Sequence, residues 1–139
     1  MKLIKEIIKH IVLFVIGGFL YYWIEIMWRG YSHYSMALLG GICFILIGRL
    51  NEQTSVHLSI LKQGVVGAVI ITTLEFLFGC ILNLWLQLDI WDYTDQPFNI
   101  FGQICIPFTA LWVILSIIAL LLDDLLRCIL FGEDMPTYK

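Results

Sequence analysis

The sequence predicts an all-α integral membrane protein: a bundle of four transmembrane helices followed by a short amphipathic C-terminal helix. Two features of the composition point to it first. The chain of 139 residues is 60% hydrophobic and only 14% charged, whereas soluble domains carry about 25% charged residues. Disordered chains need low hydrophobicity and high net charge, and the net charge here is only −3. An ordinary soluble fold and a disordered chain are therefore both excluded.

The third observation is that long apolar segments recur along the chain. A helix needs about 20 apolar residues to cross the hydrocarbon core of a bilayer. The second segment is short and rich in glycine, and it counts as a span because helices tilt and their end residues snorkel. Pro107, near the start of the fourth segment, predicts a bend there. The four predicted spans are residues 7–28, 34–50, 64–86 and 100–122.

These spans leave no room for a separate soluble domain, so residues 1–139 are expected to form a single transmembrane domain. Residues 87–99 are its outer loop. Residues 123–132 are expected to lie along the inner membrane surface as an amphipathic tail. In that tail Asp123 and Arg127 have the spacing of a helical ion pair. Gly132 is expected to stop the helix.

The basic residues predict the orientation, because cytoplasmic loops of membrane proteins are enriched in Lys and Arg. The predicted outer side holds one basic residue, Arg29, and its long loop is acidic. Both termini are therefore expected in the cytoplasm, as in a multi-pass protein of the plasma membrane. The basic residues on the predicted inner side are Lys2, Lys5, Lys9, Arg49, Lys62, Arg127 and Lys139.

Polar residues inside the predicted spans are the first candidates for a site. Glu25 and Arg29 share one face of the first span and are expected to pair near its outer end. Glu75 lies near the middle of the third span, with Asn83 further along the same face. A carboxylate in the membrane costs about 2.5–3.5 kcal/mol on insertion scales, so it normally faces the protein interior. Glu75 is thus expected to be either a functional acid or a hydrogen-bonded structural one. Its candidate partners are Thr72, Thr109, Trp112 and a neighbouring subunit.

The segment from Leu88 to Gln103 gathers acids, amides and aromatic rings, and two interpretations of it stay open. In the first, polar side chains bond the local backbone and build a structural cap, anchored by Trp91, Tyr93 and Pro97. In the second, the loop is a lid over a pocket between the first and third spans. The polar lining of that lid would be Asp92, Asp95, Asn99 and Gln103.

The same segment resembles the signature of a bacterial family, the ABC-transporter type IV (CmpB-like) permeases. In that family a W-D-Y-S motif is followed by an Asn and by a G-x-I-C stretch. The corresponding residues here are Trp91–Thr94, Asn99 and Gly102–Cys105. Thr94 stands where the family has Ser. The resemblance implies a permease subunit in the bacterial cytoplasmic membrane.

Further points of resemblance lie upstream. Leu74–Glu75 is similar to the family's L-E pair, and Glu25 with Arg29–Gly30 is similar to its first-span acid and R-G turn. The stretch Tyr31–Gly40 departs from the family, which has G-P…P-I-Y-G at this place. The similarity covers about Tyr22 to Trp112, most of the chain.

The residues favour a small transport component, with an outward-facing polar site between the first and third spans under the W-D-Y-T-D loop. Intramembrane acids often mark ion or proton pathways. One alternative is a non-transporting accessory or interaction subunit whose polar faces join helices. Another is an intramembrane enzyme acting on a lipid-linked substrate, with Glu75 and Asp92 as acid and base.

Other features bear on chemistry and partners. The sequence contains no P-loop and no hydrolase motif, so no catalytic residue is assigned. His10, His33 and His57 lack metal-ligand spacing, and no metal or cofactor is expected. The sequence pI near 5.4 gives no basic surface for nucleic acid. The expected partners are the lipid bilayer, further copies or other membrane subunits, and a separate ATPase subunit.

Overall fold

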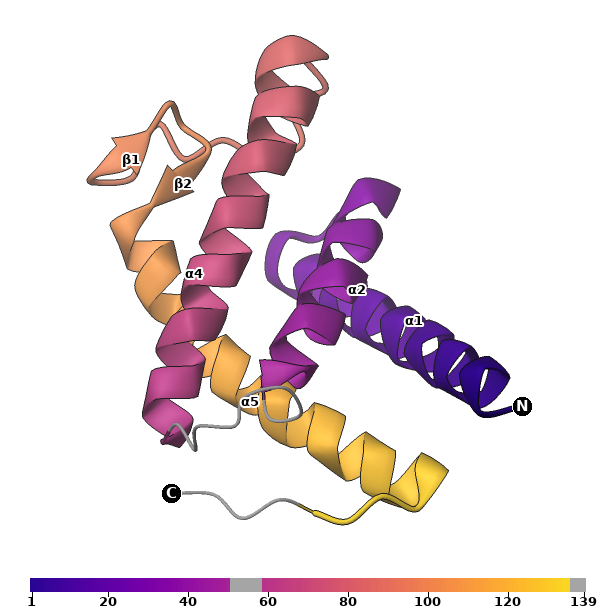
Figure 1. Cartoon of the computed structure of the whole chain (residues 1–139). Helices are drawn as coiled ribbons and strands as arrows, with labels where there is room; N and C mark the ends of the chain where they lie inside the picture. Colours follow the sequence, from indigo (N-terminus) through magenta and orange to yellow (C-terminus); the bar gives the residue numbers. More distant parts are fainter. Residues whose placement is uncertain (51–58, 136–139) are drawn as a thin grey trace.

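The computed structural model describes residues 1–50 and 59–135; His57 and Lys139 lie outside these ranges. The described chain is mostly helical (Figure 1). Helix α4 continues directly into a π-helical segment, η1. The helices are α1 (Lys2–Arg29), α2 (Tyr34–Gly48), α4 (Ile60–Gly79), η1 (Cys80–Trp85) and α5 (Ile106–Phe131). Two short antiparallel strands, β1 (Asn99–Ile100) and β2 (Ile104–Cys105), precede α5.

The helices associate as two pairs, α1 with α2 and α4 with α5. The pairs meet mainly through α2, which contacts both α4 and α5, whereas α1 has few contacts with α5 (Figure 1). Small residues allow the close approaches that membrane helices use. A side chain at Gly18 would collide with the backbone carbonyl of Ala37, and one at Gly67 with Ser116. The space between α1 and α5 is left less tightly filled.

The helix expected to form the fourth span begins at Ile106, later than predicted. Residues 99–105 form a β hairpin instead of helix, with Asn99 opposite Cys105 and Ile100 opposite Ile104. Gly102, in the hairpin turn, has a φ of 72°, a left-handed conformation that a right-handed helix does not contain. Pro107 consequently lies in the first turn of α5, where its missing N–H is tolerated, and not inside a helix where it would cause a bend.

The predicted amphipathic tail is the last part of α5 and not a separate helix. As expected, the helix ends at Gly132, whose φ of 68° forms a left-handed cap. Asp123, Asp124 and Arg127 are buried in this part of the helix. The ion pair expected from their spacing is present, with 2.8 Å between Arg127 Nε and Asp123 Oδ2. The charges are buried because opposite charges meet at this end of the bundle.

Two helices of the described chain are long and apolar enough to cross a membrane, Lys2–Arg29 and Ile60–Trp85. The helix Tyr34–Gly48 is apolar but shorter. Only 17% and 28% of the most apolar parts of the two long helices are buried inside the protein. The core helix of a soluble protein would be mostly buried, so these outward-facing apolar side chains indicate a membrane protein.

Candidate functional site: two cavities beside Glu75

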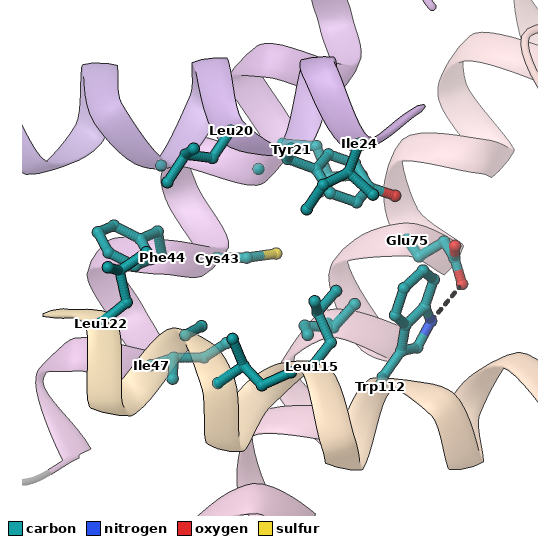
Figure 2. A pocket seen from close by; sticks show the side chains of 16 residues that line it. Leu20, Tyr21, Ile24, Cys43, Phe44, Ile47, Glu75, Trp112, Leu115 and Leu122 are labelled. Atoms are coloured by element: carbon teal, nitrogen blue, oxygen red, sulfur yellow. Dashed lines mark hydrogen bonds between the residues drawn. The ribbon is translucent and has the colours of Figure 1, made fainter. Parts of the chain in front are cut away.

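A cavity of about 220 Å³ lies where α1, α2, α4 and α5 meet (Figure 2). Its wall is almost entirely apolar. Glu75 lies at one end of the cavity, and Phe44 and Leu122 lie at the other end. The Cys43 thiol points into the cavity from α2. The cavity is therefore an apolar chamber with a single carboxyl group at one end. We call it the inner cavity.

Glu75 is only 2% exposed, and its hydrogen-bond partners among the described residues are uncharged. Tyr93 Oη donates to Glu75 Oε2 at 2.9 Å, and Trp112 Nε1 donates to Oε1 at 3.3 Å. Trp112 is one of the partners expected from the sequence. The other two candidates bond each other, since Thr72 Oγ1 donates to Thr109 Oγ1 at 3.2 Å. In the described part of the chain, no ion pair reaches Glu75, and its known partners are neutral.

Tyr93 brings the outer loop into contact with this carboxyl group. The side chain points inward, and its ring stacks on Phe108 of α5 with 4.9 Å between centroids. Burial raises the pKa of Tyr93, and the nearby Glu75 raises it further. The phenol therefore keeps its proton and acts as a donor. The sequence identified Tyr93 as a loop anchor, and its anchoring partner is Glu75.

A second cavity, of about 240 Å³, lies between α1, α5 and the loop. We call it the outer cavity. Glu25 and Arg29 line it, and their expected ion pair is present, with 2.7 Å between Arg29 Nε and Glu25 Oε2. Arg29 Nη1 also donates to the backbone carbonyl of Ile90 at 3.0 Å. The end of α1 is thus tied to the start of the loop.

Tyr21 and Trp112 line both cavities and separate their polar groups. Their rings are in edge-to-face contact, with centroids 6.4 Å apart. Glu75 therefore lines one cavity and the Glu25–Arg29 pair lines the other, with Tyr21 and Trp112 in the walls of both.

Asn83 and Gln103 hold the loop against the end of the long helix. Asn83 Nδ2 donates to Gln103 Oε1 at 2.8 Å, and Asn83 Oδ1 accepts from the Ile90 N–H at 2.7 Å. Trp91 Nε1 donates to the Gln103 carbonyl at 3.0 Å, and Trp91 is buried. Asn83 belongs to the π-helical segment, and such segments re-aim side chains at many functional sites. These residues support the site but do not line either cavity.

The remaining predicted lid residues face away from the cavities and build turns. Asp92 Oδ1 accepts from the Thr94 N–H at 2.9 Å, and Asn99 Oδ1 accepts from the Gly102 N–H at 3.0 Å. Asp92 and Asp95 are exposed, as is Pro97 in the following turn. The loop contributes one side chain to the cavities, Tyr93.

Two cavity residues had not been identified from the sequence. Tyr21 lines both cavities, whereas the sequence pointed only to Glu25 and Arg29 in this helix. The signal was the spacing Gly17–Tyr21–Ile24, which places three cavity residues on one helix face. Cys43 is a buried free thiol on the wall of the inner cavity. Within residues 1–50 and 59–135, no group of three or more His, Cys, Asp or Glu side chains could hold a metal ion.

Comparison of the sequence with known protein families identifies one family. The sequence profile of the family described as "Putative ABC-transporter type IV" matches residues 12–128. The chain belongs to this family. No curated protein and no solved structure matches the chain.

Of the positions that resemble this ABC-transporter type IV family, Glu25, Arg29, Glu75 and Tyr93 line the two cavities. Glu75 and Glu25 are separated by 50 positions along the chain, yet each lines a cavity that shares Tyr21 and Trp112 with the other. Tyr93, from the W-D-Y-T stretch, joins Glu75 to the loop. The family description indicates a transport-related membrane subunit.

Proposed function

We propose that this chain is a transmembrane component of a transport system and that its substrate passes Glu75. The observation that carries the proposal is the environment of this acid. Glu75 is buried on the wall of a cavity between helices and held by neutral donors. Such an acid in a membrane protein is typical of ion and substrate pathways. Membership of the ABC-transporter type IV family supports the same class of function.

The proposed path has an outer and an inner part. The Glu25–Arg29 pair lies in the outer cavity, and Glu75 lies in the inner one. Tyr21 and Trp112 stand between them as an aromatic gate. The W-D-Y-T-D loop covers the outer end, with Tyr93 as its contact to Glu75. Opening would require Tyr21 and Trp112 to separate.

The proposal includes the topology predicted from the sequence. Helices α2 and α5 would cross the membrane together with the two longer apolar helices, giving four spans. Both termini would lie in the cytoplasm, because the basic residues concentrate on that side. Reporter fusions at each terminus test this: two cytoplasmic reporters are expected, and a periplasmic signal at either end would contradict it.

We propose that transport needs further subunits. The sequence has no nucleotide-binding motif of the P-loop type, and four spans are few for a complete pathway. A separate ATPase subunit, further copies of the chain, or both would complete the transporter. The chain itself would supply a binding site and no catalytic group.

The test is native mass spectrometry of the tagged chain, purified in mild detergent from cells that express it naturally. The expected species contains an ATP-hydrolysing subunit in fixed stoichiometry. The Glu75→Gln variant should assemble like the wild type, while the complex loses most of its ATPase activity. The exposed acid Asp89 offers a matched control, Asp89→Asn, which should retain that activity. A monomer with no partner would overturn the proposal.

A non-transporting accessory subunit is the second candidate, and one observation favours it. The hydrogen bonds of Asn83 and Gln103 are made within the chain, so these polar groups are explained by structure alone. An accessory role predicts that Glu75→Gln changes assembly, or nothing, and leaves ATP hydrolysis per complex unchanged. The same experiment therefore separates the two candidates.

A further inference from the structure

Among residues 1–50 and 59–135, Glu75 has no counter-charge of the kind that Glu25 and Asp123 have. Glu25 pairs with Arg29, and Asp123 pairs with Arg127. The two hydrogen bonds to Glu75 come from uncharged donors. A carboxylate has about four lone-pair sites, so two hydrogen bonds leave capacity for a ligand. In an apolar chamber, screening is weak and a cation supplied by a ligand would be strongly attracted.

The wall around Glu75 favours one kind of cation. Tyr21 and Trp112 flank the Glu75 end of the cavity from opposite sides, and the rest of the wall is apolar (Figure 2). Aromatic rings attract cations through their faces, and the attraction is largest when the cation is desolvated. A small inorganic cation would lose its water shell here without enough oxygen ligands. An organic cation carries its own apolar groups, which match this wall.

The size of the chamber limits the ligand. A cavity of roughly 150 Å³ lined by apolar side chains holds one benzene molecule. The inner cavity has about 220 Å³, which leaves room for one ring and a small ammonium group. A phospholipid headgroup fits poorly, because its phosphate would lie beside the carboxylate.

We infer that the inner cavity binds a small apolar organic cation, with its charge on Glu75 and its apolar groups against Tyr21, Trp112 and the opposite wall. The inference rests on the proposed function, because it names the substrate class of the same site. The positive charge is essential, and the apolar part gives the ligand its fit. A neutral molecule of the same shape would contact the wall but would bring no positive charge to Glu75.

The test is isothermal titration calorimetry of the purified chain in a nonionic detergent. The probe is benzyltrimethylammonium, and its neutral isostere neopentylbenzene is titrated in parallel. The wild type should bind the cation at least tenfold more tightly than the isostere. Glu75→Gln should lose roughly tenfold or more in affinity for the cation and bind the isostere as before.

Two variants keep the result interpretable. Glu75→Asp retains the charge, so it should retain the preference for the cation even if its affinity is lower. Asp89→Asn removes an exposed acid and should bind as the wild type does. Retained binding of the isostere by Glu75→Gln shows that the cavity is still formed. If that binding is lost as well, the Glu75→Asp variant is the test: a retained preference for the cation supports the inference, and a lost preference overturns it.

The inference is overturned if the wild type does not bind the cation, or if it binds the cation and the isostere equally. It is also overturned if Glu75→Gln keeps the preference for the cation over the isostere, or if Glu75→Asp loses it. Failure of the proposed function is separate. Cation binding by a chain that has no transport partner would leave this inference standing and overturn the transport role. An ATP-hydrolysing complex whose membrane subunit does not bind the cation would support the transport role and overturn this inference.

Discussion

Two buried carboxyl groups of this chain, Glu75 in α4 and Asp123 in α5, are held in different ways. Asp123 is 0% exposed and pairs with Arg127 one turn away at 2.8 Å. Glu75 is 2% exposed and accepts hydrogen bonds from Tyr93 and Trp112. The fold supplies a counter-charge for Asp123, whereas Glu75 has neutral partners and borders a cavity.

The comparison shows that burial alone does not identify a functional acid. Asp123 belongs to a group of charges that joins the two ends of the chain, in which Lys9 Nζ also lies 3.1 Å from Glu133 Oε2. These charges have a structural role, since they link α1 to the segment after α5. What distinguishes Glu75 is the combination of burial, neutral partners and adjacent empty volume.

The largest effect is expected where the fold supplies the counter-charge. Arg127→Met leaves Asp123 buried without its cation, which should lower the free energy of unfolding by about 3–5 kcal/mol. Chemical unfolding of the purified protein in detergent measures the change. The double variant Arg127→Met/Asp123→Leu removes both charges and should recover most of the loss. A loss below about 1 kcal/mol in the single variant, as for an exposed pair, would show that the pair does not hold this end together.

The next effect tests how closely Asp123 is packed. Gly48 of α2 lies against its carboxyl group, and a side chain there would collide with it. Gly48→Ala should destabilise the protein by about 1–3 kcal/mol, the usual cost of overpacking. Adding Asp123→Ala opens the space again, so the double variant should lose less than the sum of the two single changes. If the losses of the two single variants simply add in the double variant, the two positions are not in contact.

A smaller effect is expected at Glu75, because its partners are neutral. Tyr93→Phe removes one hydrogen bond but keeps the ring stacked on Phe108. We expect a loss of about 1 kcal/mol, together with faster amide hydrogen exchange in the loop. Tyr34→Phe is the matched control, since Tyr34 is 79% exposed. If both variants are as stable as the wild type and exchange equally slowly, Tyr93 does not fasten the loop to Glu75.

The smallest effect is a pH dependence near the N-terminus. Glu6 lies before the first predicted span, and its hydrogen bond with Lys9 lowers its pKa from the ordinary value of 4.5. Because the folded state favours the ionised form, the contribution is fully present above pH 4.5 and is lost as the pH falls through the lowered pKa. Melting temperatures of the wild type and Glu6→Gln should therefore converge as the pH falls below 4.5. A gap that stays constant with pH would contradict this assignment.

Local features of the structure could be predicted from the sequence. The Glu25–Arg29 and Asp123–Arg127 pairs follow from a spacing of one helical turn, and Gly132 ends α5 as its position indicates. These predictions succeed because a helix fixes its own neighbours. The family resemblance likewise rested on short motifs, and the family profile confirms it.

Long-range contacts could not be predicted in the same way. The bond between Tyr93 and Glu75 joins residues 18 apart, and it forms because a hairpin at residues 99–105 turns the loop back over the bundle. The apolar residues of that hairpin look like the start of a span. Similarly, Asp123 and Arg127 look like a polar helix face, yet Asp123 is buried with its carboxyl group against Gly48 of α2, and Arg127 Nη1 lies 3.8 Å from Glu133 Oε1 beyond the helix end.

The central claim, that Glu75 makes the inner cavity favour cations, can be tested most directly through Cys43. Its thiol points into the same cavity (Figure 2), so its modification rate reports the local concentration of a reagent. In a variant with Cys80, Cys105 and Cys128 replaced by Ala, a cationic aminoethyl methanethiosulfonate is compared with its neutral propyl analogue. We predict that the cationic reagent modifies Cys43 faster than the neutral one, each rate being taken relative to that with a free thiol. Glu75→Gln should abolish this difference. Equal rate ratios with Glu75 and with Gln at this position, or no modification of Cys43, would contradict it.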